Sequence, residues 1–319
     1  MMMFSVVIPL YNKAPYIAKA IQSVLAQTFN DYELIVVDDG SKDNSADVAA
    51  YAIEGHANCR LIRQENEGVS MARNIGVAAS HGDFLCFLDA DDWWDSHFLD
   101  ELSKLIIEYP EAGIYGTNYT IVNETKHKTR VSPIGVEPGF EKGYINYCQV
   151  YSNALAMPLT SISVAIPRDV FNEMKGFPRG VKLGEDFLLW IHIALKYKVA
   201  FLNKPLAYYN QDVDVTHRGV GHLYPPAEHM LWNLADLEPL ERIDEDYKHL
   251  IDRLRANSLL KYYVSSEYHA AAKQELVKID WHDKGLRYGF LYRMPRFLVK
   301  LIVNARTIGS QVKRFFSSI

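Results

Sequence analysis

The 319-residue chain has few cysteines and no long apolar run. Its three cysteines, Cys59, Cys86 and Cys148, are odd in number and far apart, which argues against a disulfide framework or a zinc site and for a reducing compartment. No window reaches the roughly eighteen apolar residues that a membrane-spanning helix needs. The first residues, MMMFSVVIPLYN, form too short an apolar run, with too little flanking positive charge, for a signal peptide. The sequence therefore predicts a cytoplasmic protein.

Acidic residues are missing from the end of the chain. Residues 287–319 contain seven Lys or Arg and no acid, so the net charge of −5 less these seven positive charges leaves −12 for residues 1–286. An acidic body without a base-reading motif argues against nucleic acid as a partner. Apolar content of 49% and charged content of 23% are typical of a globular protein.

Apolar strands alternate with helical patterns in the first half of the chain. The expected strands are 4–10, 33–39, 59–64 and 83–89, and the expected helices are 14–27, 43–53 and 69–80. Continuous apolar strands that alternate with helices predict a mostly parallel sheet, sandwiched by helices as in Rossmann-like α/β folds.

The second half is less regular. It predicts a strand at 161–167, helices at 169–177 and 185–197, and two short strands around Pro205 within 199–210. From about residue 225 the pattern is almost entirely helical. We therefore expect an α/β domain over 1–222, with halves 1–92 and 93–222, and a helical C-terminal region over 223–319.

Polar residues follow each of the first four expected strands. They are Tyr11 and Asn12, Asp38 and Asp39, Asn66, and Asp89 and Asp91. Ligands of such sheets bind beyond the carboxyl ends of the strands. These residues therefore predict one binding site at this edge.

The stretch FLCFLDADDWWD (84–95) places Asp89, Asp91 and Asp92 directly after an apolar strand. Carboxylates so close together repel one another unless a cation lies between them. Oxygen ligands at positions i and i+2 suit Mg²⁺ or Mn²⁺ shared with a diphosphate. The alternative is that the cluster only caps the following helix, and for Asp92 alone that alternative stays open.

Five segments together resemble family 2 glycosyltransferases with the GT-A fold. They are FSVVIPLYN, ELIVVDDGSKDNS, NEGVSMARNIG, FLDADDWW and GEDFLLW, in the family's order over about residues 3–215. The resemblance implies a nucleotide-sugar donor, commonly a UDP-sugar, and a divalent metal. It makes Asp91 the direct metal ligand and Asp89 a contact to the ribose or the metal.

The resemblance also implies a nucleotide pocket. Its residues would be Pro9, Tyr11, Asn12, Asp39, Asn66, Arg73 and Asp89. Asp39 would contact the base, Asp38 would hold its turn, and Arg73 would pair with phosphate or stack on the base. A packing role for Tyr11 is the alternative.

An acid at a loop-to-helix junction can serve as a general base. Transfer to a hydroxyl by direct displacement needs such a base, and the resemblance assigns this role to Asp186, with Glu185 as its neighbour. The alternative is that both acids cap the helix, since acids favour helix N-termini. His217 lies where some relatives place a residue that contacts the metal or the diphosphate, and the alternative is that it contacts neither.

The chain departs from the family's processive polysaccharide synthases. Their Q-x-x-R-W signature is absent, because Trp190 follows FLL without the required Gln and Arg. No membrane-spanning helix is predicted either. We therefore expect a non-processive enzyme. Relatives of this organisation often build bacterial surface polysaccharide or lipopolysaccharide, which implies a glycan or lipid-linked acceptor.

The basic tail interleaves cations with Phe, Leu, Ile and Val over 287–316. From Pro295 onward it predicts an amphipathic helix that can lie on the inner face of an anionic membrane. The alternative is a terminal helix that packs on the domain or on a partner.

An inverting, metal-dependent glycosyltransferase fits these features best. Two other classes stay open. A sugar nucleotidyltransferase would carry a glycine- and Arg/Lys-rich loop near its start, which KAPYIAK (13–19) is not. A catalytically silent scaffold that binds nucleotide-sugars would be expected to lack Asp186 or the LDADD acids, and all are present.

Overall fold

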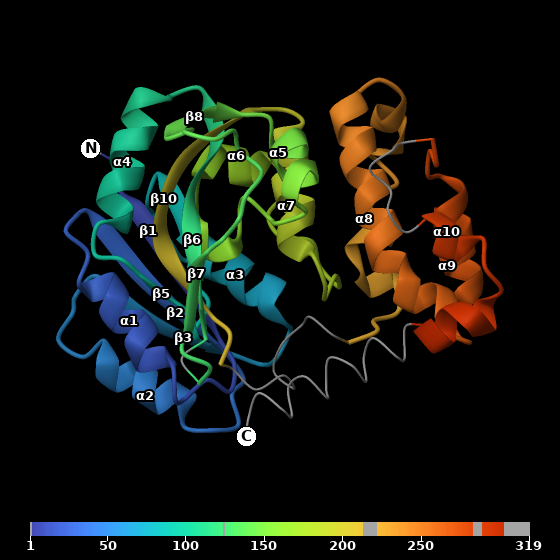
Figure 1. The fold of residues 1–319 in the computed structure, drawn as a ribbon. Coiled ribbons are helices and arrows are strands. Elements are labelled where there is room, and N and C mark those ends of the chain that lie inside the picture. The colour runs from blue at the N-terminus through green and yellow to red at the C-terminus, as the bar shows by residue number, and fades with distance from the viewer. Residues whose placement is uncertain (1, 124, 213–221, 283–288, 303–319) are drawn as a thin grey trace. The chain divides into compact units, whose positions relative to one another are not determined.

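The structure of the chain, a computed structural model, describes residues 2–123, 125–212, 222–282 and 289–302 (Figure 1). Contacts within the chain group its residues into two compact units. Unit 1 contains Met1–Gly221 and Ala227–Asn233, and unit 2 contains His222–Pro226 and Leu234–Ile319. The expected boundary after residue 222 stays a prediction about domains.

Unit 1 is built on a ten-stranded sheet with the order β3-β2-β1-β4-β9-β6-β10-β5, while β7 pairs with β6 and β8 with β10. The strands are β1 (Phe4–Leu10), β2 (Tyr32–Asp39), β3 (Cys59–Gln64), β4 (Phe84–Phe87), β5 (Trp93–Trp94), β6 (Ala112–Asn123), β7 (Lys128–Val131), β8 (Lys142–Ile145), β9 (Val164–Pro167) and β10 (Lys198–Asn210). β1 pairs in parallel with both β2 and β4, and β2 pairs in parallel with β3. The expected parallel half is confirmed.

The other half of the sheet is mixed. β9 runs antiparallel to both β4 and β6, and β6 runs parallel to β10. The two short strands expected around Pro205 are wrong: β10 is one strand, with register shifts on both sides of this residue. Proline cannot donate to the ladder, so the strand is irregular there without ending. β6, which lies centrally in the sheet, was not among the expected strands.

Helices cover both faces of the sheet (Figure 1). The helices of unit 1 are α1 (Ile17–Leu25), α2 (Ser45–Ala52), α3 (Val69–Ala78), α4 (Phe98–Glu108), α5 (Tyr147–Ala154), α6 (Arg168–Glu173) and α7 (Glu185–Ala194). The even-numbered side chains of β1 share one core with α1, α2 and α4. α3 packs on the opposite face so closely that a Cβ at Gly76 would lie 2.3 Å from Val7 Cγ1. The layered α/β fold therefore follows from strands that are apolar on both faces.

Unit 2 is helical, as expected. It contains α8 (Glu245–Val264), α9 (His269–Val277), α10 (Gly289–Tyr292) and a further helical segment at 296–302. Leu291 and Val299 are buried, whereas Phe290, Phe297 and Leu301 are exposed. The tail is therefore amphipathic over the part that the structure describes.

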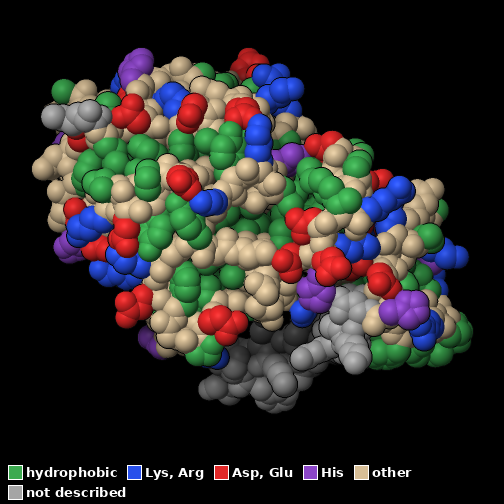
Figure 2. Space-filling model, turned by 90° about the horizontal axis from the view of Figure 1, so that it is seen from above, with side chains coloured by type: hydrophobic (Ala, Val, Ile, Leu, Met, Phe, Trp, Pro, Cys, Tyr) green, Lys and Arg blue, Asp and Glu red, His purple; other side chains and the backbone are tan. Residues whose placement is uncertain are grey.

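The surface mixes charges of both signs. Figure 2 shows acidic and basic side chains interspersed over one face of the molecule, with apolar patches between them. Ion pairs at the surface of unit 1 include Lys104–Asp100 and Lys182–Glu228. Among the described residues, every helix is too short or too polar to span a bilayer.

Candidate active site

The LDADD segment lies between β4 and β5. The pairing of β5 with Ala207 and Tyr208 of β10 holds its far end. The side chains of Asp89 and Asp91 are 34% and 19% exposed. Both carboxylates therefore lie at the carboxyl edge of the sheet, within reach of a ligand.

Asp92 differs from these two acids because its side chain is buried. Its Oδ1 accepts a hydrogen bond of 2.7 Å from the backbone N–H of Asn210, while its Oδ2 has no partner among the described residues. Burial raises the pKa of Asp92 well above its usual range, and Asp91 and Asp89 raise it further. Asp92 does not cap α4, because Asp95 accepts the N–H of His97 where that helix begins. Asp92 instead ties the acidic segment to the end of β10.

Arg73 connects the LDADD segment to the acid pair that begins α7. It lies on α3, and its side chain is only 3% exposed. Its two terminal nitrogens donate to Asp89 Oδ1 at 2.7 Å and to Glu185 Oε1 at 3.0 Å. The guanidinium also lies 5.0 Å from the ring centre of Phe177. Both terminal nitrogens, which we expected to contact a nucleotide, are thus engaged by carboxylates.

Glu185 and Asp186 form the first turn of α7. Gly184, just before them, has a φ of +81°, and a Cβ there would lie 2.5 Å from Met230 Sδ, so glycine is required. The N-terminus of a helix stabilises negative charge. The junction therefore presents two adjacent carboxylates toward Arg73.

The environment of this pair disfavours ionisation. Burial raises the pKa of Glu185 to about 7, Asp186 raises it too, and Arg73 opposes the rise. Burial also raises the pKa of Asp186, against the attraction of Arg73 and a hydrogen bond of 2.7 Å from the N–H of Phe187. Ser161 Oγ lies 3.4 Å from Asp186 Oδ2. Carboxyls with raised pKa values are common in catalytic sites.

Three tyrosines lie close enough to Asp186 for its charge to shift their pKa values. The pKa values of Tyr119, Tyr147 and Tyr151 are raised chiefly by burial and also by this carboxylate. Tyr147 Oη is buried and lacks a hydrogen-bond partner among the described residues. The carboxylate of Asp186 therefore has an aromatic, poorly solvated side.

The VDDGS turn is held by its own two acids. Asp38 Oδ1 accepts from the N–H of Ser41 at 3.2 Å, in line with the turn-holding role expected for it. Asp39 accepts from Gln64 Nε2 and from the N–H groups of Glu67 and Gly68 at 2.8, 2.8 and 2.9 Å. Asp39 thus fixes the loop before α3, and its contact to a base stays a prediction.

The remaining nucleotide candidates lie beside this turn. Pro9 is within β1, opposite Val37. Asn12 has a φ of +50° and accepts from the N–H of Lys42 at 2.8 Å, which joins the two loops. Asn66 Nδ2 donates to the carbonyl of Asp39 at 3.0 Å. Tyr11 is 44% exposed, so it is not a packing residue of the core.

Sequence patterns missed Lys13, which lies directly after Asn12. Its ammonium is 2.6 Å from Asp91 Oδ2, and the two side chains are 14% and 19% exposed. The available signal was its position, because it follows the polar residues that end the first strand. His217 lies outside the described residues.

Carboxyl groups outnumber cations in this cluster. Among the described residues, the five carboxyl groups of Asp89, Asp91, Asp92, Glu185 and Asp186 interact with one another or with two cations, Lys13 and Arg73. Among the residues that the structure describes, no three His, Cys, Asp or Glu side chains converge to hold a metal by themselves. Mg²⁺ commonly takes one or two carboxylates and completes its shell with phosphate oxygens and water. The cluster therefore fits a divalent cation shared with a diphosphate.

The fold resembles that of a solved structure, S. aureus TarS. The structure of S. aureus TarS 1–349 in complex with UDP-GlcNAc matches with a TM-score of 0.59 and 19% sequence identity, over 86% of this chain and 70% of that one. At this level of identity the match concerns the fold alone. It confirms the predicted α/β architecture with helices on both sides of the sheet.

Relatives with higher sequence identity are named glycosyltransferases. Glycosyltransferase GlyA of Streptococcus pneumoniae is 33% identical over 212 residues, which cover 64% of this chain but only 30% of GlyA. The uncharacterized glycosyltransferase alr2836 of Nostoc sp. is 35% identical over 216 residues, 65% of this chain and 64% of the relative. Both matches cover less than two thirds of the relative's length.

The family itself is shown by a match to more than half of the chain. The model described as glycosyl transferase family 2 matches residues 5–173. This range contains three of the five motifs that suggested the family and all of FSVVIPLYN except Phe4, and GEDFLLW follows it. The chain therefore belongs to glycosyl transferase family 2, a family of enzymes that transfer sugars.

Proposed function

We propose that this chain is an inverting, metal-dependent glycosyltransferase that moves a sugar from a UDP-sugar to a hydroxyl of a glycan or lipid-linked acceptor. The observation that carries the proposal is the cluster around Arg73, in which the acids after β4 meet the acids that begin α7. The acids that would bind the donor and the acids that would act on the acceptor therefore lie on two sides of one guanidinium. That TarS structures contain UDP and UDP-GlcNAc supports a uridine donor.

The donor would bind at the carboxyl edge of the parallel half of the sheet. Tyr11 is exposed there for stacking on a base, and Asn12, Asp39 and Asn66 shape the loops around it. Asp89 would contact the ribose through Oδ2, because Arg73 donates to its Oδ1. Arg73 would act mainly by orienting Asp89, because its guanidinium is buried.

Asp91 and Asp89 would hold the divalent cation, Mn²⁺ or Mg²⁺, together with the diphosphate. When bound, such a cation stabilises the negative charge that develops on the leaving diphosphate. Asp92 would keep the acidic segment fixed against Asn210. The excess of carboxyl groups at this edge favours such a cation.

Asp186 would act as the general base. It would take the proton of the acceptor hydroxyl while the hydroxyl oxygen attacks the anomeric carbon on the side opposite the diphosphate. The bond from that carbon to the diphosphate oxygen breaks, and its electrons leave with the nucleoside diphosphate. A raised pKa, caused by burial, suits a carboxylate that must accept a proton. Glu185, paired with Arg73, would support the position of its neighbour.

The competing functions have less support. A sugar nucleotidyltransferase does not agree with membership of glycosyl transferase family 2. A silent scaffold would not need the raised pKa values of two adjacent acids. We therefore favour the enzyme, in bacterial surface polysaccharide or lipopolysaccharide synthesis.

We also propose that the tail contacts the inner face of an anionic membrane. Phe290, Phe297 and Leu301 are 59%, 65% and 62% exposed, and Arg293 and Lys300 between them are exposed too. Apolar side chains interleaved with cations complement the interface of an anionic bilayer. Sedimentation with phosphatidylglycerol vesicles tests this proposal, and Phe297→Ser with Leu301→Ser should abolish it. Binding to phosphatidylcholine vesicles of equal strength, or none to either, would contradict it.

The enzymatic proposal is tested by a thermal-shift panel of UDP, GDP, CDP and dTDP, each with and without Mn²⁺. A ligand that binds only the native state raises the melting temperature. We expect UDP with Mn²⁺ to give the largest shift and Asp91→Ala to abolish the Mn²⁺-dependent part. Asp100→Ala, on the exposed pair with Lys104, is the matched control and should keep the shift. No shift with any nucleotide would contradict the donor site.

A further inference from the structure

Lys13 is a positive charge that the proposed mechanism does not use. It follows the carboxyl end of β1, and its ammonium lies 2.6 Å from Asp91 Oδ2. The distance is that of a strong, charge-assisted hydrogen bond. Lys13 thus occupies one of the oxygens that a divalent cation would need.

The backbone of Lys13 is fixed, while its side chain spans the gap to Asp91. Its N–H donates to Ser45 Oγ at 2.8 Å, and its carbonyl accepts from Tyr16 and Ile17 at 2.9 and 3.0 Å. The residue is therefore anchored at the start of α1 independently of the ion pair. Only the flexible four-carbon stem has to move for the ammonium to leave Asp91.

An ammonium and a divalent cation cannot share this carboxylate oxygen. Their like charges would lie within a few ångströms, in a partly buried place where repulsion is stronger than in water. If the cation binds Asp91, Lys13 must release it. A diphosphate would offer the displaced ammonium new oxygens at the same edge of the sheet.

We propose that Lys13 is the resident counter-ion of Asp91, that it exchanges with the divalent cation, and that this exchange makes cation binding depend on the nucleotide. In the free protein, Lys13 neutralises Asp91 and opposes the cation. When a nucleoside diphosphate binds, the ammonium of Lys13 would move to the phosphate oxygens, which leaves Asp91 free to hold the cation. The inference rests on the proposed cation site.

Titration calorimetry with Mn²⁺ tests the exchange, first without nucleotide and then with saturating UDP. Wild-type protein should bind Mn²⁺ weakly alone and much more tightly with UDP. Lys13→Met removes the competing charge and keeps the apolar stem. We expect it to bind Mn²⁺ alone about tenfold more tightly, as for the loss of one charged hydrogen bond, and to gain little more from UDP.

Two matched variants separate charge from structure. Lys13→Arg keeps a cation at this position and should behave like wild type. Lys42→Met, at an exposed lysine on the neighbouring loop, should leave Mn²⁺ binding unchanged. Melting temperatures of the variants show whether each is folded before it is titrated.

The outcomes distinguish the exchange from the cation site. If wild type binds Mn²⁺ with UDP but Lys13→Met does not tighten Mn²⁺ binding, or weakens it, the exchange is wrong and the cation site stands. If wild type binds no Mn²⁺ even with UDP, the cation site itself is wrong and the exchange falls with it.

Discussion

Each unit contains a buried Arg–Glu pair, and the two glutamates are similarly exposed but have pKa values shifted in opposite directions. In unit 1, Arg73 contacts Glu185, whose side chain is 13% exposed, and burial raises the pKa of this glutamate to about 7. In unit 2, Arg255 contacts Glu241, whose side chain is 10% exposed. Burial alone would raise the pKa of Glu241, but hydrogen bonds and attraction from Arg255 outweigh it, and the pKa is lowered.

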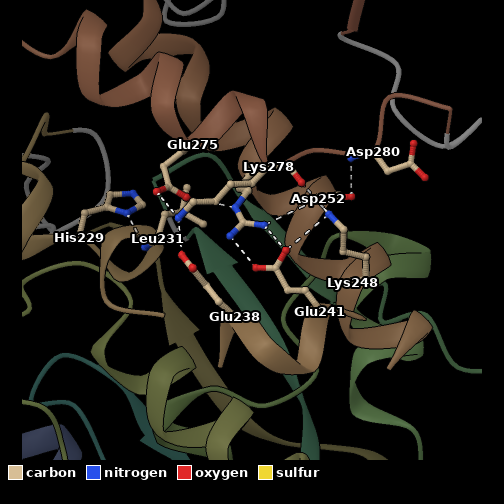
Figure 3. Close-up of polar contacts among 10 residues, drawn as sticks. His229, Leu231, Glu238, Glu241, Lys248, Asp252, Glu275, Lys278 and Asp280 are labelled. Carbon is tan, nitrogen blue, oxygen red and sulfur yellow. Dashed lines mark hydrogen bonds and ion pairs between the residues drawn. The ribbon is translucent and has the colours of Figure 1, made fainter. Parts of the chain in front are cut away.

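The number of cationic donors explains the difference. Glu241 receives both terminal nitrogens of Arg255 at 2.7 Å and also lies 3.5 Å from Lys248. Figure 3 shows how Lys248 and Lys278 lie among the acids of this cluster, Glu238, Glu241, Asp252 and Glu275. Glu185 accepts one hydrogen bond from Arg73, whose other terminal nitrogen donates to Asp89. The neighbouring carboxylate of Asp186 raises the pKa of Glu185 further.

The comparison separates stability from function. In the unit 2 cluster all three guanidinium nitrogens of Arg255 contact carboxylates. The unit 1 cluster leaves carboxylates short of cations, and Arg73 Nε has no partner among the described residues. Such a deficit is what we would expect of the proposed site, which would bind a cation and accept a proton.

The largest expected effect is on catalysis, from Asp186→Asn. Removal of a general base lowers turnover by about 10²–10⁴-fold, and we expect about 10³-fold in a coupled assay for UDP release. Mn²⁺-dependent UDP binding should survive, because the residues proposed to bind the donor lie elsewhere. If turnover fell less than tenfold, Asp186 would not be the base.

Arg255→Met should have the largest effect on stability. It leaves buried carboxylates without their main partner, a change that costs about 3–5 kcal/mol. Urea unfolding followed by fluorescence measures this loss. Arg242→Met, at an exposed arginine nearby, is the control and should change stability by less than about 0.5 kcal/mol. Equal effects of both variants would contradict a structural role for the cluster.

Neutralising the two glutamates should change stability in opposite directions. At pH 8, Glu185→Gln should stabilise the protein by about 2 kcal/mol, because the folded state disfavours the ionised carboxyl. Glu241→Gln should destabilise it by about 2 kcal/mol, since its ionised form is favoured. Paired urea titrations measure both. Changes of the same sign would remove the contrast between the two units.

The pH dependence gives the smallest and most specific effect. Between its ordinary pKa of 4.5 and its folded value of about 7, Glu185 is protonated in the folded state and ionised in the unfolded state. Stability from this group is therefore present below pH 4.5 and is lost as the pH rises to 7. The advantage of Glu185→Gln should grow over this window and then level off. Glu241, with a lowered pKa, should lose its contribution only as the pH falls below 4.5.

Local patterns predicted much of the fold and most of the candidate site. Strands such as Phe4–Leu10 are apolar on both faces, and their periodicity does not depend on distant contacts. β6 was missed because its polar and apolar residues follow no simple period, yet nine of its first ten residues are buried between β9 and β10. Its place in the sheet depends on pairing partners far along the chain.

The sequence by itself determined the strand-end acids, the GEDFLLW junction, the family and the amphipathic tail, because each depends on residues close together in the chain. Only the tertiary structure decided which charges meet. Arg73 pairs with Glu185 across 112 positions, and Lys13 pairs with Asp91 across 78. A charge has no fixed partner in a linear pattern, so the electrostatics of the site follow from the packing of α3 and α7 and of the loop after β1.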